Sequence, residues 1–463
     1  MSAFGAKVVA ARAVGELARR AGRGGGTSLP GKMLIRLEPQ AIGELAARLE
    51  RGSAVISATN GKTTTAAMTA SVLTAAGVPL VHNRAGANMA GGVASALLAA
   101  ARPSGRIDGE LGLFEIDEFW LDRVVPQLHP RAVLLANLFR DQLDRYGELE
   151  TIADRWAGVV TSMPGRARLV LNADDPLIAD LGRDRTGVTY FGLEDPSVAL
   201  PELQHASDSK HCRRCGAAYS YEAIYLGHLG RYRCPSCGQE RPSPSVAAEQ
   251  IRLAGTRSAR FRLVSASGAR TVELPLPGLY NVYNALGAAS LCLELGIEVD
   301  TVVRGLQSVT AAFGRAELVT VGGVEVSILL IKNPAGANEI VRTLALEPAE
   351  IDLLAILNDR TADGRDVSWI WDADFELLAS RLRRVTCAGT RAAELALRLK
   401  YAGVEMQRLH VTPSLPDALD QAIGATSKGR LFVLPTYTAL LELRDELAGR
   451  GHVSQFWQRE HGS

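Results

Sequence analysis

The sequence has 463 residues, with 51 Lys and Arg against 50 Asp and Glu, so its formal net charge is +1. A chain this close to neutral excludes a chain-wide electrostatic attraction to nucleic acid, and an aromatic content of 5% counts against base-stacking platforms. The length and an apolar fraction of 47% fit about three globular domains, and no apolar run approaches the roughly 18 residues of a membrane span.

Residues 1–50 form an N-terminal arm that is rich in Ala, carries Arg12, Arg19 and Arg20, and is interrupted by three glycines at 24–26. It lacks the sustained apolar stretch and cleavage site of a secretory signal, so we expect a cytoplasmic protein. We expect this arm to be a helix docked on the rest of the chain. The alternative is a basic helix on anionic lipid, which would place the protein peripherally at the inner face of the membrane.

Residues 51–310 predict a central α/β domain with a parallel sheet, because short apolar runs alternate with helical stretches. The first run, 54–58, precedes a helix that ends near Ala76. After residue 245 we expect a strand over 251–264, another over 271–276, and a helix from Asn284 to about Leu295. The other buried-strand candidates are Leu111–Ile116, Ala132–Asn137 and Leu169–Asn172.

The segment Thr59–Thr64 joins the first strand to its helix and has the composition of a phosphate-binding loop. Gly61 allows the backbone to approach oxygens closely, Lys62 offers a compact positive charge, and the Thr63 hydroxyl suits Mg²⁺. The first glycine of the general G-x-x-x-x-G-K-[ST] motif is absent, because Ile56 stands there. A turn with a capping threonine is the alternative.

An acidic stretch, Glu115–Glu118, closes the strand that begins at Leu111. Carboxylates at the carboxyl ends of parallel strands lie where α/β proteins bind ligands, and Mg²⁺ requires oxygen ligands. Glu115 is the candidate metal ligand, with Asp117 and Glu118 as its neighbours, and a solvated turn is the alternative.

Residues 205–245 are polar, break the α/β pattern, and predict an inserted module. Its two C-x-x-C pairs are separated by 18 residues, which is typical of a structural zinc ribbon with four thiolate ligands: Cys212, Cys215, Cys234 and Cys237. A pair of disulfides is the alternative. Nucleic-acid binding through the arginines of this module is a further possibility that we disfavour, since such charges are usually a solvated face. Cys292 and Cys387 lie in apolar stretches and are expected to be buried.

Residues 311–463 show a second α/β pattern, which predicts a C-terminal domain. Its strand candidates are Val324–Ile331, Leu353–Leu357, Arg384–Cys387 and Leu431–Leu434.

Four motifs, in order, resemble those of the Mur ligase family, which includes the folylpolyglutamate synthetases. They are the loop Thr59–Thr63, the segment 137–145 (similar to N-x-x-x-D-H-L-D), the segment 277–285 (similar to G-x-H-N-x-x-N-A), and Gly314–Glu317, similar to an arginine motif that opens the family's third domain. The resemblance implies an ATP-dependent ligase with a Mur ligase-like fold. It implies that Asn281 and Asn284 face the nucleotide together with Thr59, Asn60 and Thr64, and that Arg315 reaches the terminal phosphate.

The chain departs from the Mur ligase pattern at four positions. Gln142 and Tyr280 replace family histidines. Lys332 replaces the histidine of the family's His-Asn-Pro segment, and Leu329 replaces an acidic residue. The metal shell and the ribose contacts therefore cannot be copied wholesale. Since only about 50 residues precede the loop, we also expect no separate domain for a UDP sugar, and hence a different substrate handle.

The truncated N-terminus, the inserted ribbon and the stretch 362–372, which resembles A-D-G-x-D-x-S-W-I-W-D, are together similar to the MurT family of synthetase subunits. Residues 25–32 also resemble that family. The resemblance implies ATP-dependent amidation of the α-carboxylate of D-glutamate in the stem peptide of lipid II, at the inner membrane surface. The implied cofactors are ATP, Mg²⁺ held by Thr63 and Glu115, and structural Zn²⁺, and the implied partner is a GatD-type glutaminase that supplies ammonia. No nucleic-acid partner is implied.

The resemblance further implies that an aspartate of the C-terminal domain completes the Cys-His pair of the glutaminase. The candidates are Asp363, Asp366 and Asp372, of which we favour Asp372, with Asp366 second; turn capping is the alternative for each. The expected catalytic residues are therefore Lys62, Arg315 and Asp372.

Two other functions stay open: a ligase that uses an amino acid as nucleophile, and a nucleic-acid-binding ATPase that reads its target through the ribbon. The sequence leaves open the third stem residue of lipid II, the stoichiometry and the ammonia path.

Overall fold

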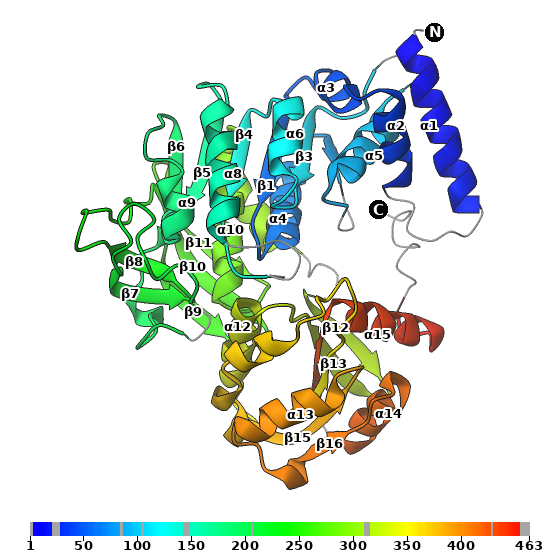
Figure 1. Ribbon diagram of the computed structural model, residues 1–463, viewed down its shortest axis with the longest axis vertical. Helices are drawn as coiled ribbons and strands as arrows, with labels where there is room; N and C mark the ends of the chain where they lie inside the picture. Colours follow the sequence, from blue (N-terminus) through cyan, green and yellow to red (C-terminus); the bar gives the residue numbers. More distant parts are fainter. Residues whose placement is uncertain are drawn as a thin grey trace.

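The computed structural model describes residues 3–20, 28–83, 87–102, 106–141, 149–204, 207–309, 315–426 and 429–453. These residues form a central domain, a small inserted hairpin, and a C-terminal domain that lies below the central sheet in Figure 1. No helix among the described residues is long and apolar enough to cross a membrane.

The central sheet has nine strands in the order β11-β10-β9-β6-β5-β4-β1-β3-β2. All neighbours from β2 to β9 run parallel, and β10 and β11 add an antiparallel extension at one edge. The strands are β1 (Ser53–Ser57), β2 (Leu80–His82), β3 (Leu111–Glu115), β4 (Ala132–Leu135), β5 (Arg168–Asn172), β6 (Val188–Leu193), β9 (Val246–Ala254), β10 (Ser258–Ser265) and β11 (Gly268–Leu274).

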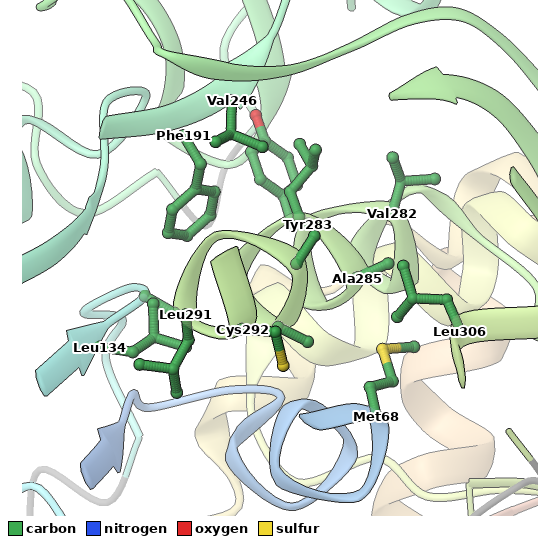
Figure 2. Close-up of a cluster of buried hydrophobic side chains, with 14 of the residues drawn as sticks. Met68, Leu134, Phe191, Val246, Val282, Tyr283, Ala285, Leu291, Cys292 and Leu306 are labelled. Carbon is green, nitrogen blue, oxygen red and sulfur yellow. The ribbon is translucent and has the colours of Figure 1, made fainter. Parts of the chain in front are cut away.

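Helices cover both faces of this sheet, because its parallel strands are apolar on both sides. Ala54 and Ile56 of β1 join one hydrophobic cluster, and Val55 between them joins the other. Figure 2 shows the first cluster around α10, where Val282 and Leu291 pack with Phe191 of the sheet and Met68 of α4. The helices are α4 (Lys62–Ala75), α5 (Ala90–Ala100), α6 (Leu121–Leu128), α8 (Leu149–Ser162), α9 (Pro176–Asp180), α10 (Leu279–Glu294), α11 (Val299–Gln307) and the short 3₁₀ helix η1 (Pro196–Val198).

The N-terminal arm contributes three helices that pack at one end of the sheet: α1 (Ala3–Arg20), α2 (Leu29–Leu37) and α3 (Ala41–Ala46) (Figure 1). Val8 and Ala11 of α1 are buried in the second cluster, and Lys7 pairs with Glu38 at 2.8 Å. The expectation of a docked helix is therefore confirmed.

The inserted module forms its own two-stranded antiparallel sheet, β7 (Ser220–Leu226) and β8 (Leu229–Arg233), at the side of the central sheet. The four ribbon cysteines flank this hairpin at its open end, two before β7 and two after β8.

The C-terminal domain has a six-stranded sheet in the order β12-β13-β17-β14-β15-β16, in which only β12 runs antiparallel to its neighbour. Leu353 and Leu354 of β14 face opposite hydrophobic clusters, so this sheet is also covered on both faces. Its elements are β12 (Arg315–Val321), β13 (Val324–Leu329), α12 (Pro334–Ala345), β14 (Ile351–Ile356), β15 (Leu382–Ala388), α13 (Ala392–Tyr401), β16 (Leu409–Val411), α14 (Leu415–Ala425), β17 (Arg430–Pro435), α15 (Tyr437–Gly449), and the 3₁₀ helices η2 (Ser368–Asp372), η3 (Phe375–Leu377), η4 (Ala379–Arg381) and η5 (Met406–Arg408).

Two sequence predictions were wrong in detail. The single strand expected over 251–264 is two strands, β9 and β10, joined by a tight turn at Gly255, whose φ of +56° suits glycine. The helix expected from Asn284 begins five residues earlier at Leu279, directly after Gly278.

Candidate functional site

The phosphate loop lies between β1 and α4, at the carboxyl end of the parallel strands, and the neighbouring strand β4 holds it in place. The backbone N–H of Thr59 donates to the carbonyl of Asn137 (3.0 Å), and that of Asn60 donates to Asn137 Oδ1 (2.9 Å). Asn137 Nδ2 in turn donates to the Asn60 carbonyl (3.0 Å). Gly61 then adopts φ +83° and starts α4, so the loop is fixed before any ligand arrives.

Lys62 is buried at the bottom of this loop and forms an ion pair with Glu118 (Nζ to Oε2, 2.6 Å). It also donates to the carbonyl of Ala58. Burial opposes the charge on Lys62, but the nearby carboxylates of Glu118 and Asp117 outweigh burial and raise the pKa of Lys62 above its ordinary value. The loop therefore favours the charged form of Lys62.

Thr63 and Glu115 offer the oxygen donors that Mg²⁺ prefers. Thr63 Oγ1 donates to Glu115 Oε1 at 3.0 Å, and Glu115 is buried at the end of β3. Asn83 fixes the backbone of Glu115 by accepting from its N–H (2.9 Å) and donating to its carbonyl (2.7 Å). The two predicted metal ligands thus lie side by side, and their donor chemistry fits the ion.

The two asparagines of α10 meet the phosphate loop from the opposite side. Asn281 Nδ2 donates to the carbonyl of Pro277 (2.7 Å), and Asn284 Nδ2 donates to Asn281 Oδ1 (3.0 Å). Asn284 Oδ1 accepts from Thr65 Oγ1 at 3.3 Å and lies so close to Gly61 that a Cβ there would be 2.1 Å from it. Both predicted residues are therefore brought to the loop.

The C-terminal domain also contacts the loop, through the residues that directly follow β13. Lys332 Nζ pairs with Asp141 Oδ2 at 2.8 Å and donates to the carbonyl of Thr59 (3.3 Å). Asn333 Nδ2 donates to Asn60 Oδ1 (2.9 Å) and to Asp141 Oδ1 (3.0 Å). Asn333 also caps α12 by accepting from the N–H of Gly336.

A cavity opens between these elements, with phosphate-loop residues Asn60, Gly61 and Thr64 on one side. Its other walls come from α10, from the turn of the β7–β8 hairpin and from α12. The lining residues include Tyr280 and Tyr283 of α10, Leu226 and Leu229 of the hairpin, Lys332, and Glu339 of α12.

Three residues of the predicted motifs lie wholly or partly outside the described part of the chain. Arg315 begins β12, but its side chain is not described. Gln142, which stands at a family histidine position, lies outside the described residues, as does Gly314. Their roles stay predictions.

The three candidate aspartates of the C-terminal domain differ in their surroundings. Asp363 is buried and accepts from the N–H (2.7 Å) and the hydroxyl (2.5 Å) of Thr438, and Asp366 accepts from the N–H of Ser368 (2.8 Å). Asp366 is exposed, and Asp372 has 39% of its side chain exposed and pairs with Arg140 at 2.7 Å. Asp363 therefore binds the first turn of α15, Asp366 caps a local turn, and Asp372 joins the C-terminal domain to the segment that follows β4.

The four ribbon cysteines come together as two matching knuckles. Their sulfur atoms all lie within 4.8 Å of one another, with Cys212–Cys237 at 3.5 Å and Cys215–Cys234 at 3.4 Å. In each knuckle a left-handed glycine follows the second cysteine and donates to the carbonyl of the first, Gly216 to Cys212 (2.7 Å) and Gly238 to Cys234 (3.1 Å).

The chemistry of this cluster fits zinc. All six cysteines are free thiols, so the disulfide alternative is not what the structure contains. Four thiols held on two tight turns are the donor set of a structural zinc ion.

The arginines of the ribbon are paired with carboxylates. Arg214 contacts Asp180 at 2.6 Å and Arg233 contacts Glu240 at 3.9 Å, while Arg213 pairs with Asp154 and Arg231 with Glu194. Charges neutralised in this way do not favour binding to a phosphate backbone.

Several site residues were not among the sequence-predicted set: Asn83, Asn137, Asp141, Lys332 and Asn333. Asn137 and Asp141 lie in the predicted motif 137–145, and Lys332-Asn333-Pro334 stands where the Mur ligases read His-Asn-Pro, so the position in the motif was a usable signal. Asn83 follows the three-residue strand β2, which no pattern predicted.

Family models and relatives agree with this geometry. The Mur ligase middle domain matches residues 56–292, and the MurT ligase C-terminal domain matches residues 330–440. The chain is 32% identical to a protein of Streptococcus pneumoniae named lipid II isoglutaminyl synthase (glutamine-hydrolyzing) subunit MurT, over 92% of this chain and 93% of that protein. It is also 32% identical to the protein of the same name from Staphylococcus aureus strain N315, over 93% and 96% of the two chains.

Solved structures show the same fold. A pseudomurein peptide ligase type C from Methanothermus fervidus superposes with a TM-score of 0.67 at 23% identity, covering 88% of this chain and 80% of that one. Folylpolyglutamate synthase from Mycobacterium tuberculosis gives a TM-score of 0.59 at 17% identity, covering 93% and 99%.

The fold and the phosphate loop thus define a Mur ligase, a member of a family of ATP-dependent ligases. Within that family, the match to both MurT relatives over nearly their whole length and the C-terminal domain model show that the chain belongs to the MurT family. Both resemblances stated from the sequence are confirmed.

Proposed function

We propose that this chain is the synthetase subunit of a lipid II isoglutaminyl synthase. It amidates the α-carboxylate of D-glutamate in the stem peptide of lipid II to D-isoglutamine, with ATP as the energy source and ammonia from a glutaminase partner. The observation that carries the proposal is the match to MurT subunits over almost the full chain, combined with a C-terminal domain that contacts the phosphate loop through Lys332 and Asn333.

ATP fits the phosphate loop because this loop combines a buried cation with an open cavity beside it. Lys62 would neutralise charge on the phosphates, and Arg315 would reach the terminal phosphate from the C-terminal domain. Thr63 and Glu115 would hold Mg²⁺, which supplies charge neutralisation on the phosphates when bound. Asn281 and Asn284 keep the loop in register for this ligand through the contacts that Asn284 makes with Asn281 and Thr65.

The chemistry proceeds in two steps because a carboxylate is a poor electrophile. A carboxylate oxygen of the substrate attacks the γ-phosphorus of ATP, the bond from phosphorus to the bridging oxygen breaks, and ADP leaves with the electron pair. Ammonia then attacks the acyl carbon and inorganic phosphate leaves with the carboxylate oxygen. One proton is lost from nitrogen, and the product is the amide. Lys62 and Arg315 stabilise the charge on the transferring phosphoryl group.

A glutaminase partner fits the exposed surface around Asp372. Trp371 is 48% exposed and contacts the ring of Tyr401 (5.8 Å between centroids), which is 69% exposed. Leu397 lies one helical turn before Tyr401 on α13 and is also exposed. We call Trp371, Leu397 and Tyr401 the apolar patch. An apolar patch beside an accessible carboxylate suits a partner that needs that carboxylate to orient a histidine, and the names of both relatives describe a subunit of a glutamine-hydrolysing enzyme.

Amide formation from ammonium tests the proposal directly. The full chain with ATP, Mg²⁺, lipid II and ammonium chloride should produce a lipid II that is lighter by the replacement of OH with NH₂, read by mass spectrometry, and Lys62→Met should abolish it. Incorporation of an amino acid in place of ammonia would contradict the proposal and favour the amino-acid ligase.

With the glutaminase co-expressed, Asp372→Asn should lower glutamine hydrolysis while the complex still forms. Unchanged hydrolysis in an intact complex would remove Asp372 from the proposal.

A further inference from the structure

The β7–β8 hairpin reaches from the four cysteines at its open end to the cavity beside the phosphate loop. Its turn runs from Leu226 to Leu229, and these two leucines, 5% and 2% exposed, line the cavity opposite Asn60 and Gly61. Leu229 and Cys234 are five positions apart along β8, which corresponds to about 17 Å of extended strand. The two ends of one hairpin are therefore the four-cysteine cluster and a wall of the cavity.

The turn also packs on the segment that holds the phosphate loop. The ring of the fully buried His228 lies 4.7 Å from the ring of Phe139, and a Cβ on Gly227 would be 3.0 Å from that same ring. The N–H of Phe139 donates to the hydroxyl of Thr59 at 3.1 Å. His228 Nε2 also lies 3.5 Å from Asp175 Oδ2, which accepts from the N–H of Leu138, so the turn contacts the segment that holds the loop by two routes.

The same hairpin contacts the C-terminal domain on the far side of the cavity. Arg342 of α12 donates to the carbonyl of Tyr225 (2.9 Å) and pairs with Glu339 (2.8 Å). Glu339 is itself a lining residue of the cavity. The hairpin therefore touches the two domains that enclose the cavity.

The open end of the hairpin has a small core, whereas its turn end is packed in the core of the central domain with Tyr225, Leu226 and Leu229. The cluster at the open end contains Tyr219 and Tyr232 packed with Cys212, Cys234 and Ala179 of α9, and the partly buried residues Tyr190, Ala217 and Tyr221 cover it. A two-stranded sheet is marginal alone. Four thiolates bound to one ion would add rigidity at the open end, since structural zinc contributes directly to folding energy.

We propose that the ribbon is a positioning element of the nucleotide site. Metal loading at the four cysteines sets the affinity for the nucleotide, and Leu226 and Leu229 form an apolar wall for its base. This inference rests on the proposed function in one respect, namely that the cavity beside the phosphate loop binds a nucleotide.

The test is calorimetric binding of MgADP to the full chain, with zinc content measured on the same samples. Leu229→Ala removes part of the wall and should weaken MgADP binding about tenfold while zinc is retained. Cys215→Ser removes an exposed ligand and should lose zinc and weaken MgADP binding by at least as much. Arg233→Ala is the matched control, because this 70%-exposed side chain lies on β8 next to Cys234 and away from the cavity, and it should bind MgADP as the wild type does.

Lys62→Met separates failure of this inference from failure of the proposed function. If Lys62→Met abolishes MgADP binding while Leu229→Ala and zinc-free Cys215→Ser bind normally, the ribbon has no positioning role and the proposed nucleotide site stands. If Lys62→Met also binds normally, the phosphate loop is not the nucleotide site and both fail. If Cys215→Ser does not fold, zinc-loaded Leu229→Ala decides alone, and normal binding by it overturns the inference.

Discussion

Gly61→Ala tests how closely the phosphate loop and α10 depend on each other. Gly61 has φ +83°, and an added Cβ would lie 2.1 Å from Asn284 Oδ1 and 2.9 Å from its Cγ. Asn284 cannot retreat freely, because it donates to Asn281 (3.0 Å) and accepts from Thr65 (3.3 Å). The substitution therefore imposes both backbone strain and the loss of side-chain contacts.

The two costs can be separated with a second glycine. Alanine in the left-handed region costs about 1–2 kcal/mol, and breaking the two hydrogen bonds of Asn284 adds about 1 kcal/mol each, so Gly61→Ala should cost about 3–4 kcal/mol. Gly52 has a similar φ of +70° with nothing within 4 Å of its Cβ position, so Gly52→Ala should show the first cost alone.

Urea unfolding of the ligand-free chain and calorimetric binding of MgADP measure both effects. Gly61→Ala should lower the free energy of unfolding by about 2 kcal/mol more than Gly52→Ala does. It should also weaken MgADP binding by more than about tenfold, whereas Gly52→Ala binds normally. Equal losses in the two variants with unchanged binding would refute the close packing of Asn284 on the loop.

Three further predictions concern the surrounding groups. Asn333→Ala should lower both activity and stability, the latter by about 1 kcal/mol of lost helix cap, whereas Asn333→Ser keeps a capping hydroxyl and should lose activity alone; thermal unfolding and initial rates check this. Glu118→Gln leaves Lys62 buried without its partner and should cost about 3 kcal/mol in urea unfolding, and a wild-type midpoint would contradict the buried pair. Burial raises the pKa of Cys387 to about 12 and raises that of Cys292 as well, so both thiols stay neutral at pH 9, where an ordinary thiol is largely ionised; iodoacetamide at that pH should label neither in the folded chain, and a labelled peptide from either would contradict this.

The local parts of the site could be predicted from the sequence. The strand, the loop and the helix around Gly61 were placed within a residue or two, because an apolar run, a glycine and a helix-forming stretch follow one another directly. The cysteine cluster was predicted from spacing alone, since two tight knuckles bring four thiolates together whatever surrounds them. Asp363 and Asp366 make the local contacts that the turn-capping alternative expects, and their roles stay predictions.

The long-range parts could not be predicted. The contacts of Lys332 and Asn333 with Asp141 join positions about 190 residues apart, and only the docking of two domains creates them. The pairing of Lys62 with Glu118 likewise depends on strands β1 and β3 being neighbours. The first turn of α10 reads Leu-Tyr-Asn-Val-Tyr, whose aromatic and β-branched residues disfavour a helix locally, so burial against the sheet overrides the propensity there.

The fate of the carboxylate oxygen tests most directly whether the chain amidates lipid II through an acyl phosphate at the Lys62 loop. Lipid II carrying ¹⁸O in the α-carboxylate of its D-glutamate is incubated with the full chain, ATP, Mg²⁺ and ammonium chloride, and the released phosphate is examined by ³¹P NMR. We predict one ¹⁸O atom in the phosphate for each amide formed, and neither product with Lys62→Met. Amide formation that leaves all ¹⁸O out of the phosphate, or phosphate release without any amide, would contradict it.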